Sequence, residues 1–427
     1  MDLLILFGGL IFLMMIGLPI TFAMGASAVF YLLVSGQMDM LIMLPNRMVL
    51  GCESYGLMAI PFFFFAGAIM SAGGLTLRLI NFSRVIVGHI TGSLALINVM
   101  ASMFFSGISG SCVSDTSAIG SVLIPAMKKD GYSPEFSAAV TGSSSTIGHI
   151  IPPSIPMILI GVIMEMPIGK LFLAGAIPGL MLGFALLAVS YIISKKRKYP
   201  KEERRADFRT VVQASIDGFF VLIMPLIVVC GIVFGVVTVT ETGVLACIYG
   251  VVLGFCYKDI TLRTFWNTIR DSAVSVGNLL IILATASFFG WVLVNTGIAN
   301  QLTDFILSIS TNKYMVLTLL VLALLIIGCG LDVIAMIFIF VPVMLPLIER
   351  IGLDPYHFSA VFVLCMGIAL LTPPVGIILF MISDMSEAPL LKVIKEIVPF
   401  LLVEIAVLAA VMYIPAISTW LPELLFK

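Results

Sequence analysis

Apolar segments long enough to cross a lipid bilayer recur along the chain from Leu3 to Leu425. A crossing helix needs about 20 predominantly apolar residues, and within the hydrocarbon every backbone polar group must find its partner inside the protein. The composition agrees, because 61% of the residues are hydrophobic and 11% are charged, whereas a soluble domain carries about 25% charged residues. We therefore predict an all-α, polytopic membrane protein that binds no nucleic acid.

One segment of the chain is clearly polar. Residues 195–205 contain seven of the 22 Lys and Arg residues, and positively charged loops stay on the cytoplasmic side of a membrane. We therefore predict a cytoplasmic basic loop at 195–215, and counting crossings outward from it places both termini on the opposite side. An amphipathic segment at about 257–271 is expected on the inner side, before a span at 272–296.

The sequence repeats itself at one constant offset, the distance from Pro125 to Pro346. The coinciding residues are Pro125 with Pro346, Gly131 with Gly352, Pro134 with Pro355, and Pro152-Pro153 with Pro373-Pro374. The first copy leaves from the inner side and the second from the outer side, so we predict two inverted repeats, which are typical of secondary transporters. The first repeat, 1–194, has scaffold and arm segments at 1–89, a re-entrant hairpin at 90–128 and a broken helix at 133–164. The second, 216–427, has scaffold and arm segments at 216–312, a hairpin at 313–348, a broken helix at 357–385 and a terminal helix at 398–420.

Each repeat contains two polar interruptions at membrane depth. The hairpin tips lie at 106–117 and 328–332, and the helix breaks lie at 143–154 and 370–376. Proline lacks an N–H and frees a carbonyl about one turn upstream, and carbonyls with hydroxyls form the oxygen shell that a hard cation needs. Helix N-termini beyond the tips add partial positive charge. The pattern therefore predicts two related cation sites and a small anionic solute.

Three motifs together resemble the large membrane subunit of tripartite ATP-independent periplasmic (TRAP) transporters. They are Ser-Gly-Ile-Ser-Gly-Ser at 106–111 with Ile124-Pro125, Ile-Pro-Pro-Ser at 151–154, and Leu-Thr-Pro-Pro-Val-Gly at 371–376. The resemblance covers essentially the whole chain. It implies an elevator-type transporter of the ion transporter superfamily in the bacterial inner membrane, with both termini periplasmic. At 238–243 the chain departs from the family pattern, because Val239 replaces a proline and Thr242-Gly243 replace two alanines, which argues against a kink near 239.

The resemblance also implies what the transporter works with. It implies sodium as the coupling ion, no organic cofactor, no enzymatic activity, a small four-helix membrane subunit, and a periplasmic substrate-binding protein that delivers an organic acid of the sialic acid or C4-dicarboxylate type. The first sodium site would use Ser109, Ser111, Gly148, Ile151 and Pro153, and the second Gly330, Asp332, Thr372 and Pro374. The candidate substrate-binding residues are Asp115, Ser145, Ser154 and Gly376.

Three alternatives to these interpretations stay open. Asp115 or Asp332 could cap the N-terminus of a half-helix instead of binding a ligand. A stand-alone proton- or sodium-coupled organic anion carrier would show the same architecture. Finally, Gly107-Ile-Ser109-Gly110 matches the Gly-x-Ser-Gly of rhomboid-type intramembrane serine proteases, with His149 as a base on the next helix, although such a protease needs no duplicated Pro-Pro break.

Overall fold

The computed structural model describes residues 2–53, 55–201 and 208–426, and all regular secondary structure in these ranges is helical. Five of the described helices are long and apolar enough to cross a membrane, and three sharply bent helix pairs raise the number of spans to as many as eight. The chain is therefore an all-α, multi-pass membrane protein, as the sequence predicted. Arg204 and Arg205 of the predicted basic loop lie outside the described residues.

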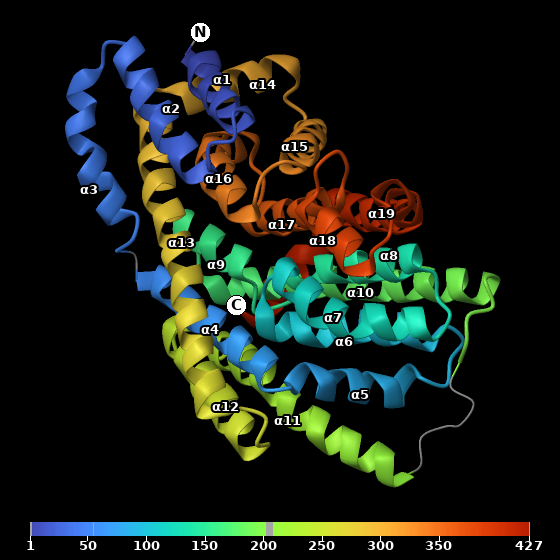
Figure 1. Cartoon of the computed structure of the whole chain (residues 1–427). Helices are drawn as coiled ribbons and strands as arrows, with labels where there is room; N and C mark the ends of the chain where they lie inside the picture. The colour runs from blue at the N-terminus through green and yellow to red at the C-terminus, as the bar shows by residue number, and fades with distance from the viewer. Residues whose placement is uncertain (1, 54, 202–207, 427) are drawn as a thin grey trace.

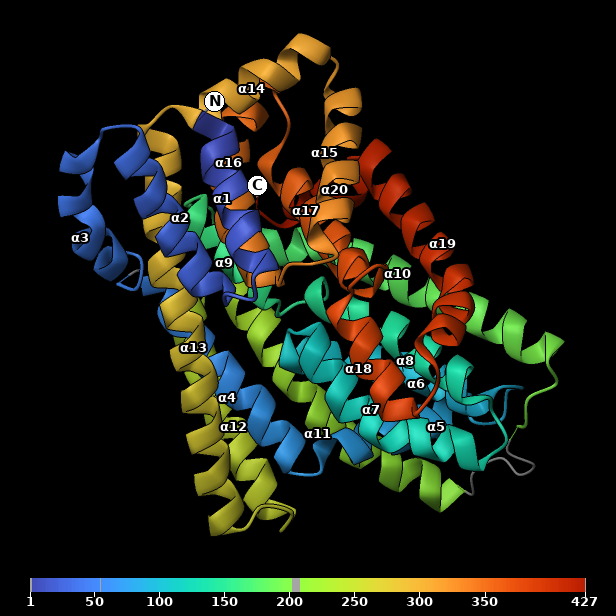
Figure 2. The ribbon, with the colours of Figure 1, turned by 45° about the horizontal axis from the view of Figure 1, so that its top comes forward.

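The scaffold and arm segments of both halves of the chain are helical. The first half supplies α1 (Asp2–Met15), α2 (Ile20–Val34), the 3-10 helices η1 (Met38–Ile42) and η2 (Tyr55–Met58), α3 (Met43–Leu50), α4 (Ala59–Ala72) and α5 (Leu75–Val87). The second half supplies α11 (Phe208–Val233), α12 (Val239–Cys256), α13 (Leu262–Asn295) and α14 (Ile298–Ile309). Figures 1 and 2 show α13 as a long rod along one edge of the molecule, where it packs on α2, α3 and α4. α4 and α5 meet at 69°, and Gly74 in the bend has a φ of +65°.

Two sequence-based boundaries differ from the structure. α13 is continuous over Leu262–Asn295, so the predicted division into a segment at 257–271 and a span at 272–296 is wrong. The terminal helix predicted at 398–420 is instead α19 (Leu390–Tyr413) and α20 (Ala416–Leu425), bent by 58°. The bend falls at Ile414, whose φ of −120° and ψ of 82° are not helical, because a residue before proline is pushed away from the helical region.

The departure from the family pattern at Val239 lies at the first residue of a helix. α12 begins at Val239, and Thr238 caps it by accepting from the Glu241 N–H at 3.2 Å while Glu241 accepts from the Thr238 N–H at 2.7 Å. Proline is favoured at the first position of a helix because its missing N–H is not needed there. Valine at this position therefore starts the same helix without a proline.

The helices of the two repeats follow one another in the same order, a hairpin and then a broken helix. Hairpin 1 is α6 (Ser93–Ser109) with α7 (Cys112–Lys129), and hairpin 2 is α15 (Lys313–Gly328) with α16 (Val333–Ile351). Broken helix 1 is α8 (Pro134–Ser145), η3 (Thr146–His149) and α9 (Ile155–Ile163), followed by α10 (Ile168–Lys196); broken helix 2 is α17 (Pro355–Leu371) and α18 (Ile377–Ser386), followed by α19. The starts of α7 and α16 are related by the same offset as the sequence repeat, and so are the starts of α8 and α17. In Figures 1 and 2, hairpin 2 lies above α17 and α18, and hairpin 1 lies below them.

A buried polar seam joins hairpin 1 to broken helix 1. α8 is buried continuously from Phe136 to Ser145, so its hydroxyls must find partners within the protein. Asn98 of α6 donates to the Thr141 hydroxyl at 2.7 Å, and Ser102 of α6 donates to the Ser144 hydroxyl at 2.9 Å. The seam fixes the position of α6 along α8 and so holds the hairpin tip beside the break.

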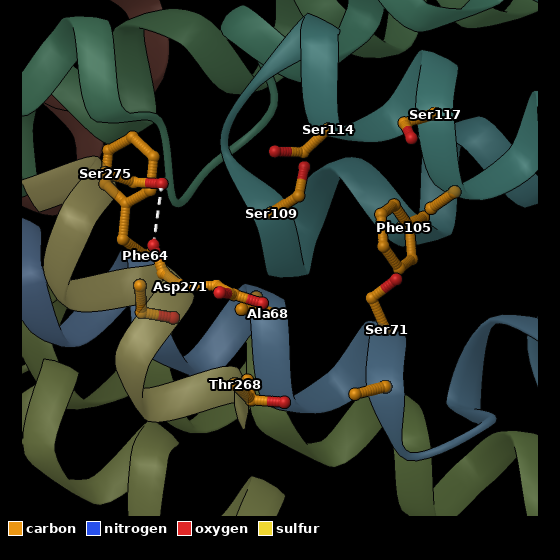
Figure 3. Close-up of a pocket in the computed structure, with 14 residues that line it drawn as sticks. Phe64, Ala68, Ser71, Phe105, Ser109, Ser114, Ser117, Thr268, Asp271 and Ser275 are labelled. Carbon is orange, nitrogen blue, oxygen red and sulfur yellow. Dashed lines mark hydrogen bonds between the residues drawn. The ribbon is translucent and has the colours of Figure 1, made fainter. Parts of the chain in front are cut away.

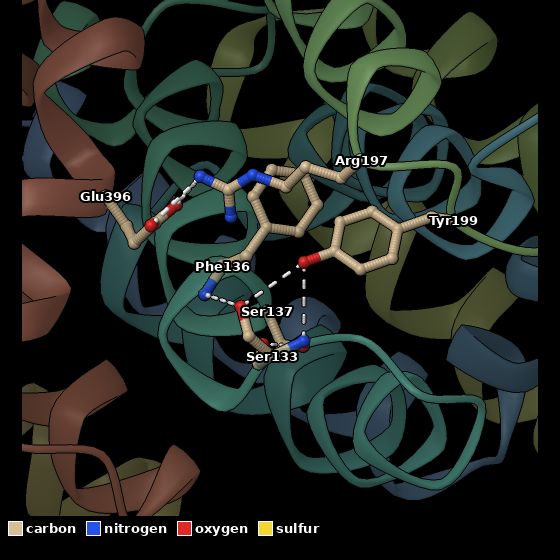
Figure 4. Close-up of polar contacts among 6 residues, drawn as sticks. All are labelled: Ser133, Phe136, Ser137, Arg197, Tyr199 and Glu396. Carbon is tan, nitrogen blue, oxygen red and sulfur yellow. Dashed lines mark hydrogen bonds and ion pairs between the residues drawn. The ribbon is translucent and has the colours of Figure 1, made fainter.

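Polar and aromatic contacts join α8, α10 and α19 at the end that carries the basic loop (Figure 4). Arg197 donates to Glu396 of α19 at 3.0 Å, and its guanidinium carbon lies 5.3 Å from the centre of the Phe136 ring. The Tyr199 hydroxyl lies 3.3 Å from the Ser133 hydroxyl, which in turn caps α8. The start of α8 is thereby held to both neighbouring helices.

Candidate functional site

The tip of hairpin 1 is a sharp turn that rests on the break between α8 and α9. Gly110, between α6 and α7, adopts a φ of +60°, a conformation that glycine adopts without a steric penalty. A Cβ atom at Gly110 would also lie 2.7 Å from the Pro153 carbonyl oxygen. The Ile155 N–H donates to the Gly110 carbonyl at 3.4 Å. The tip and the break are therefore in direct contact.

Four of the five residues predicted for the first sodium site lie around this contact. The Ser111 N–H donates to the Ser109 hydroxyl at 3.2 Å, and a Cβ atom at Gly148 would lie 3.2 Å from the Ser111 carbonyl carbon. Pro153 adjoins the same turn. Ile151 lies in the same break, but its side chain packs against α10, so it offers only its carbonyl. The groups gathered here present oxygen atoms, which fit a hard monovalent cation.

Asp115 lies fully buried between the two helices of hairpin 1. Its carboxylate accepts from the Ser106 hydroxyl at 2.9 Å and from the Ser109 hydroxyl. Ser111, and not Asp115, occupies the N-cap position of α7, so capping does not account for this acid. A Cβ atom at Gly148 would collide with the Asp115 carboxylate. Asp115 therefore reaches from the tip to the break.

The tip of hairpin 2 also contacts its break. The Gly376 N–H donates to the Cys329 carbonyl at 2.9 Å, and the Cys329 sulfur lies 3.5 Å from the Pro373 carbonyl oxygen. Gly330 and Pro374 are exposed. The second predicted sodium site is therefore more open than the first.

The two side chains of the second predicted site are both engaged with the backbone. Asp332 is the N-cap residue of α16, and its Oδ2 accepts from the Ile334 N–H at 3.0 Å. The Thr372 hydroxyl donates to the Ile368 carbonyl at 2.7 Å. The capping alternative is thus observed for Asp332. A carboxylate has about four lone-pair sites, so capping leaves positions at which it can also bind a cation.

The four predicted substrate-binding residues are enclosed in this conformation. Asp115, Ser145 and Ser154 are fully buried, and Gly376 is buried beside the tip of hairpin 2. Ser145 donates to a carbonyl of its own helix at 2.7 Å, and Ser154 caps α9. A cavity that Ser109 helps to line instead adjoins the first tip.

That cavity, with a volume of about 430 Å³, lies between hairpin 1, α4 and α13 (Figure 3). Hairpin 1 contributes Ser109, Ser114 and Ser117, and α13 contributes Thr268, Asp271, Ser272 and Ser275. The remaining lining residues are Phe64, Gly67, Ala68, Ser71, Ala72, Phe105 and Ala118. Gly67 permits a close approach, because a Cβ atom there would lie 3.3 Å from the Ser109 Cα.

Hydroxyl groups dominate the chemistry of this cavity. Seven of its side chains are Ser or Thr, two are Phe, and Asp271 carries the one charge among the lining residues. Such a surface can hydrogen-bond many hydroxyls of a solute and pack against its apolar faces. Ser109 is the one lining residue that also belongs to the predicted first sodium site.

Sequence reasoning missed the α13 wall of the cavity, although a signal was present. Thr268, Asp271, Ser272 and Ser275 stand at spacings of three, one and three residues, and side chains three and four apart share one face of a helix. The expected helix boundary at 271 divided this stripe. If a continuous helix had been predicted over 262–295, these four residues would have appeared together on one of its faces.

The intramembrane protease geometry does not occur among the described residues. The Ser109 hydroxyl donates to Asp115, and in the described ranges no hydrogen bond joins it to His149, whose Nδ1 is buried without a partner. In the same ranges, no group of three or more His, Cys, Asp or Glu side chains is placed to hold a metal ion. The site is therefore built from oxygen donors around two interrupted helices.

Comparison with known proteins matches this architecture over nearly its whole length. The profile of the family described as "Tripartite ATP-independent periplasmic transporter, DctM component" matches residues 7–417. The chain is 34% identical to the sialic acid TRAP transporter large permease protein SiaM of Vibrio cholerae over 416 residues, covering 96% of each protein. It is 36% identical to the C4-dicarboxylate TRAP transporter large permease protein DctM of Pseudomonas aeruginosa over 372 residues, covering 87% of each.

A solved structure shares the fold without close sequence similarity. The YdaH transporter of Alcanivorax borkumensis superimposes with a TM-score of 0.68 over 99% of each chain, at 14% identity. That likeness concerns the fold alone. Together with the full-length sequence matches, it confirms the resemblance seen in the motifs: the chain belongs to the DctM component family of the tripartite ATP-independent periplasmic transporters.

Proposed function

We propose that this chain couples the uptake of a small organic acid to the entry of sodium. The proposal rests on Ser109, which both lines the cavity and adjoins the oxygen atoms of the first tip and break. A cation bound there would attract the Ser109 oxygen and order the tip. Occupancy of the cation site and of the cavity would then influence each other, as coupled binding requires.

The position of the cavity supports an elevator mechanism. One wall, hairpin 1, packs with α8 and α18, and α8 packs with α19, whereas the other wall consists of α4 and α13. Solute sites of transporters built from inverted repeats lie at the interface between the moving and the fixed parts. In this proposal the hairpins and broken helices slide as one body past α4 and α13, carrying the solute with the tip.

The lining of the cavity favours a polyhydroxylated acid of the sialic acid type over a C4-dicarboxylate. A dicarboxylate brings two negative charges, yet no Lys, Arg or His lines the cavity and Asp271 adds a further acid. A polyhydroxylated monocarboxylate brings one charge and many hydroxyls for the Ser and Thr side chains. The large permeases named for sialic acid and for C4-dicarboxylates are both similar to the chain.

The family assignment supports a three-part system. The family is described as tripartite and periplasmic, and its relatives are named large permease proteins. In this proposal the chain lies in the bacterial inner membrane with both termini periplasmic, beside a small four-helix membrane subunit. A periplasmic substrate-binding protein delivers the organic acid to the cavity.

The test is uptake of radiolabelled sialic acid into vesicles containing the chain, its small subunit and its binding protein. An inward sodium gradient should drive uptake, and replacing sodium by choline should abolish it. Ser109→Ala should weaken the response to sodium. Ser121→Ala is the matched control, because the Ser121 side chain is exposed on α7 and bonds the Ala118 carbonyl. Sodium-independent uptake would overturn the proposed sodium coupling, and full uptake without the binding protein would favour a stand-alone carrier.

A further inference from the structure

A buried carboxyl group on α19 contacts the break of helix 1 and takes no part in the proposed sodium sites. Glu404 is fully buried, and its Oε1 lies 3.1 Å from the hydroxyl oxygen of Thr146, the first residue of η3. Its other oxygen, Oε2, has no hydrogen-bonding partner among the described residues. A buried carboxylate in such surroundings is costly unless it is neutralised. The partners of Glu404 therefore indicate which form is present.

The Thr146 hydroxyl is the one hydrogen-bonding partner of the Glu404 carboxyl among the described residues. It donates to the Glu404 Oε1 at 3.1 Å and also lies 2.7 Å from the Ser143 carbonyl oxygen of its own helix. A charged carboxylate has about four lone-pair sites to satisfy, and this single hydroxyl is shared with a carbonyl. Full burial with one unpartnered oxygen therefore favours the protonated carboxyl.

The titratable groups nearest to Glu404 supply no compensating positive charge. The Cys112 sulfur of α7 lies 3.6 Å from the Thr146 carbonyl oxygen, and Asp115 on the same helix is itself an acid. His149 stands three residues after Thr146 in η3, and residues three apart in a 3-10 helix share a face. The Nδ1 of His149 is buried and unpartnered among the described residues.

The charged groups on the other helices packed against α19 lie near helix ends. Glu135 of α8 is paired with Lys392 at 3.7 Å, and Arg197 beyond α10 is paired with Glu396 at 2.8 Å. Lys313 is the first residue of α15, and Asp384 lies in the last turn of α18. On α17, Cys365 points to a carbonyl of α15, and His357 bonds Ser418. None of these described groups contacts the Glu404 carboxyl.

We propose that Glu404 is a proton-binding site attached to the first break and that uptake requires this proton. Thr146 belongs to broken helix 1 and Glu404 to α19. The hydrogen bond between them therefore links the protonation of the Glu404 carboxyl to the position of Thr146. A local movement of Thr146 within the broken helix would remove the hydrogen-bonding partner of the carboxyl and let it exchange its proton. The transport part of this inference rests on the proposed carrier activity, whereas proton binding itself does not.

Infrared spectroscopy of the purified protein tests proton binding without any transport. The wild-type protein should show the C=O stretching band of a protonated carboxyl, and Glu404→Gln should remove it. Glu396→Gln is the matched control, because Glu396 lies on the same helix and pairs with Arg197 at the surface. If Glu404→Gln does not fold, Thr146→Val should shift the same band, because the hydrogen-bonding partner of the carboxyl is lost. Identical wild-type and variant spectra across the pH range would overturn the proposal.

Uptake by the complete three-part system tests the requirement for the proton. Above the midpoint of its titration, the protonated fraction of a single group falls about tenfold per pH unit, and wild-type uptake should fall in proportion. Glu404→Gln should transport with a rate that stays within about twofold over the same range. A wild-type pH profile in this variant would overturn the proposal. Failure of uptake in every arm would reject the carrier function and leave the infrared result standing.

Discussion

Replacing Gly110 by alanine tests whether contact between the first tip and the first break controls sodium binding. The chain offers a matched control in Gly131→Ala. Both glycines adopt positive φ values, +60° and +86°, so both variants place alanine in a left-handed conformation. A Cβ atom at Gly131 meets nothing within 4 Å, whereas at Gly110 it would lie 2.7 Å from the Pro153 carbonyl oxygen and 3.2 Å from the Ile155 nitrogen.

The difference between the two variants therefore isolates the contact. The left-handed backbone costs alanine about 1–2 kcal/mol at either position. At Gly110 the tip must also move several tenths of an ångström away from the break, which lengthens the 3.4 Å hydrogen bond from Ile155. Losing one such bond costs about 1 kcal/mol. Displacing the ligands by a comparable free energy raises the half-saturating sodium concentration by about fivefold.

The measurement is the sodium dependence of uptake in vesicles, paired with thermal unfolding of each purified variant. Both variants should unfold at lowered temperatures, with Gly110→Ala the lower of the two, and Gly110→Ala alone should need about fivefold more sodium. Equal half-saturating sodium concentrations in the two variants would refute the reasoning. In that case the first tip would contact the break without ordering a cation site.

Three further predictions concern the second tip, the cavity and the end contacts. Asp332→Ala should lose the cap of α16, which lowers the unfolding free energy by about 0.5–2 kcal/mol, and should weaken the sodium response. Asp332→Asn should keep the cap and lose only the sodium response. Unchanged sodium dependence of uptake in both variants would show that Asp332 acts as a cap alone. Ser114→Ala should raise the half-saturating substrate concentration about fivefold through one lost hydrogen bond at constant sodium dependence, and an unaltered substrate response would place the solute elsewhere. Arg197→Gln should lower the unfolding free energy by about 1 kcal/mol or less, and a midpoint unchanged at low salt would show that the pair with Glu396 and the contact with Phe136 contribute nothing.

The interruptions could be predicted from the sequence because glycine and proline act locally. Gly110 and the pair Pro152-Pro153 mark a turn and a break whatever surrounds them, and the recurrence of the Pro-Pro pair at the constant offset of the repeat showed that the pattern was not accidental. The structure brings each tip against its own break, through Gly110 with Ile155 and through Gly376 with Cys329. Those pairings followed from the family resemblance, and the repeat supported them.

The cavity could not be predicted in the same way, because its walls come from distant parts of the chain. Ser71 of α4 and Ser275 of α13 are separated by almost half of the sequence, and no local rule states that their helices face hairpin 1. The stripe from Thr268 to Ser275 was visible, but a polar stripe on a membrane helix fits a cavity, a subunit contact or an aqueous surface equally well. Packing of α13 on α4 decides among them.

The two repeats share a backbone arrangement but have different side chains at equivalent positions of their tips. At the offset that places Pro125 on Pro346, Asp332 corresponds to Ser111, and Asp115 corresponds to Met336. The acid of the second repeat therefore caps α16 beside an exposed tip, whereas the acid of the first repeat lies one turn inside α7, buried and bonded to Ser109. Since Ser109 also lines the cavity, only the first acid has a hydrogen-bonded connection to the proposed solute cavity through a described residue. A cation at the first tip would accordingly act on the solute through one hydroxyl, and a cation at the second tip would act through the movement of the hairpins.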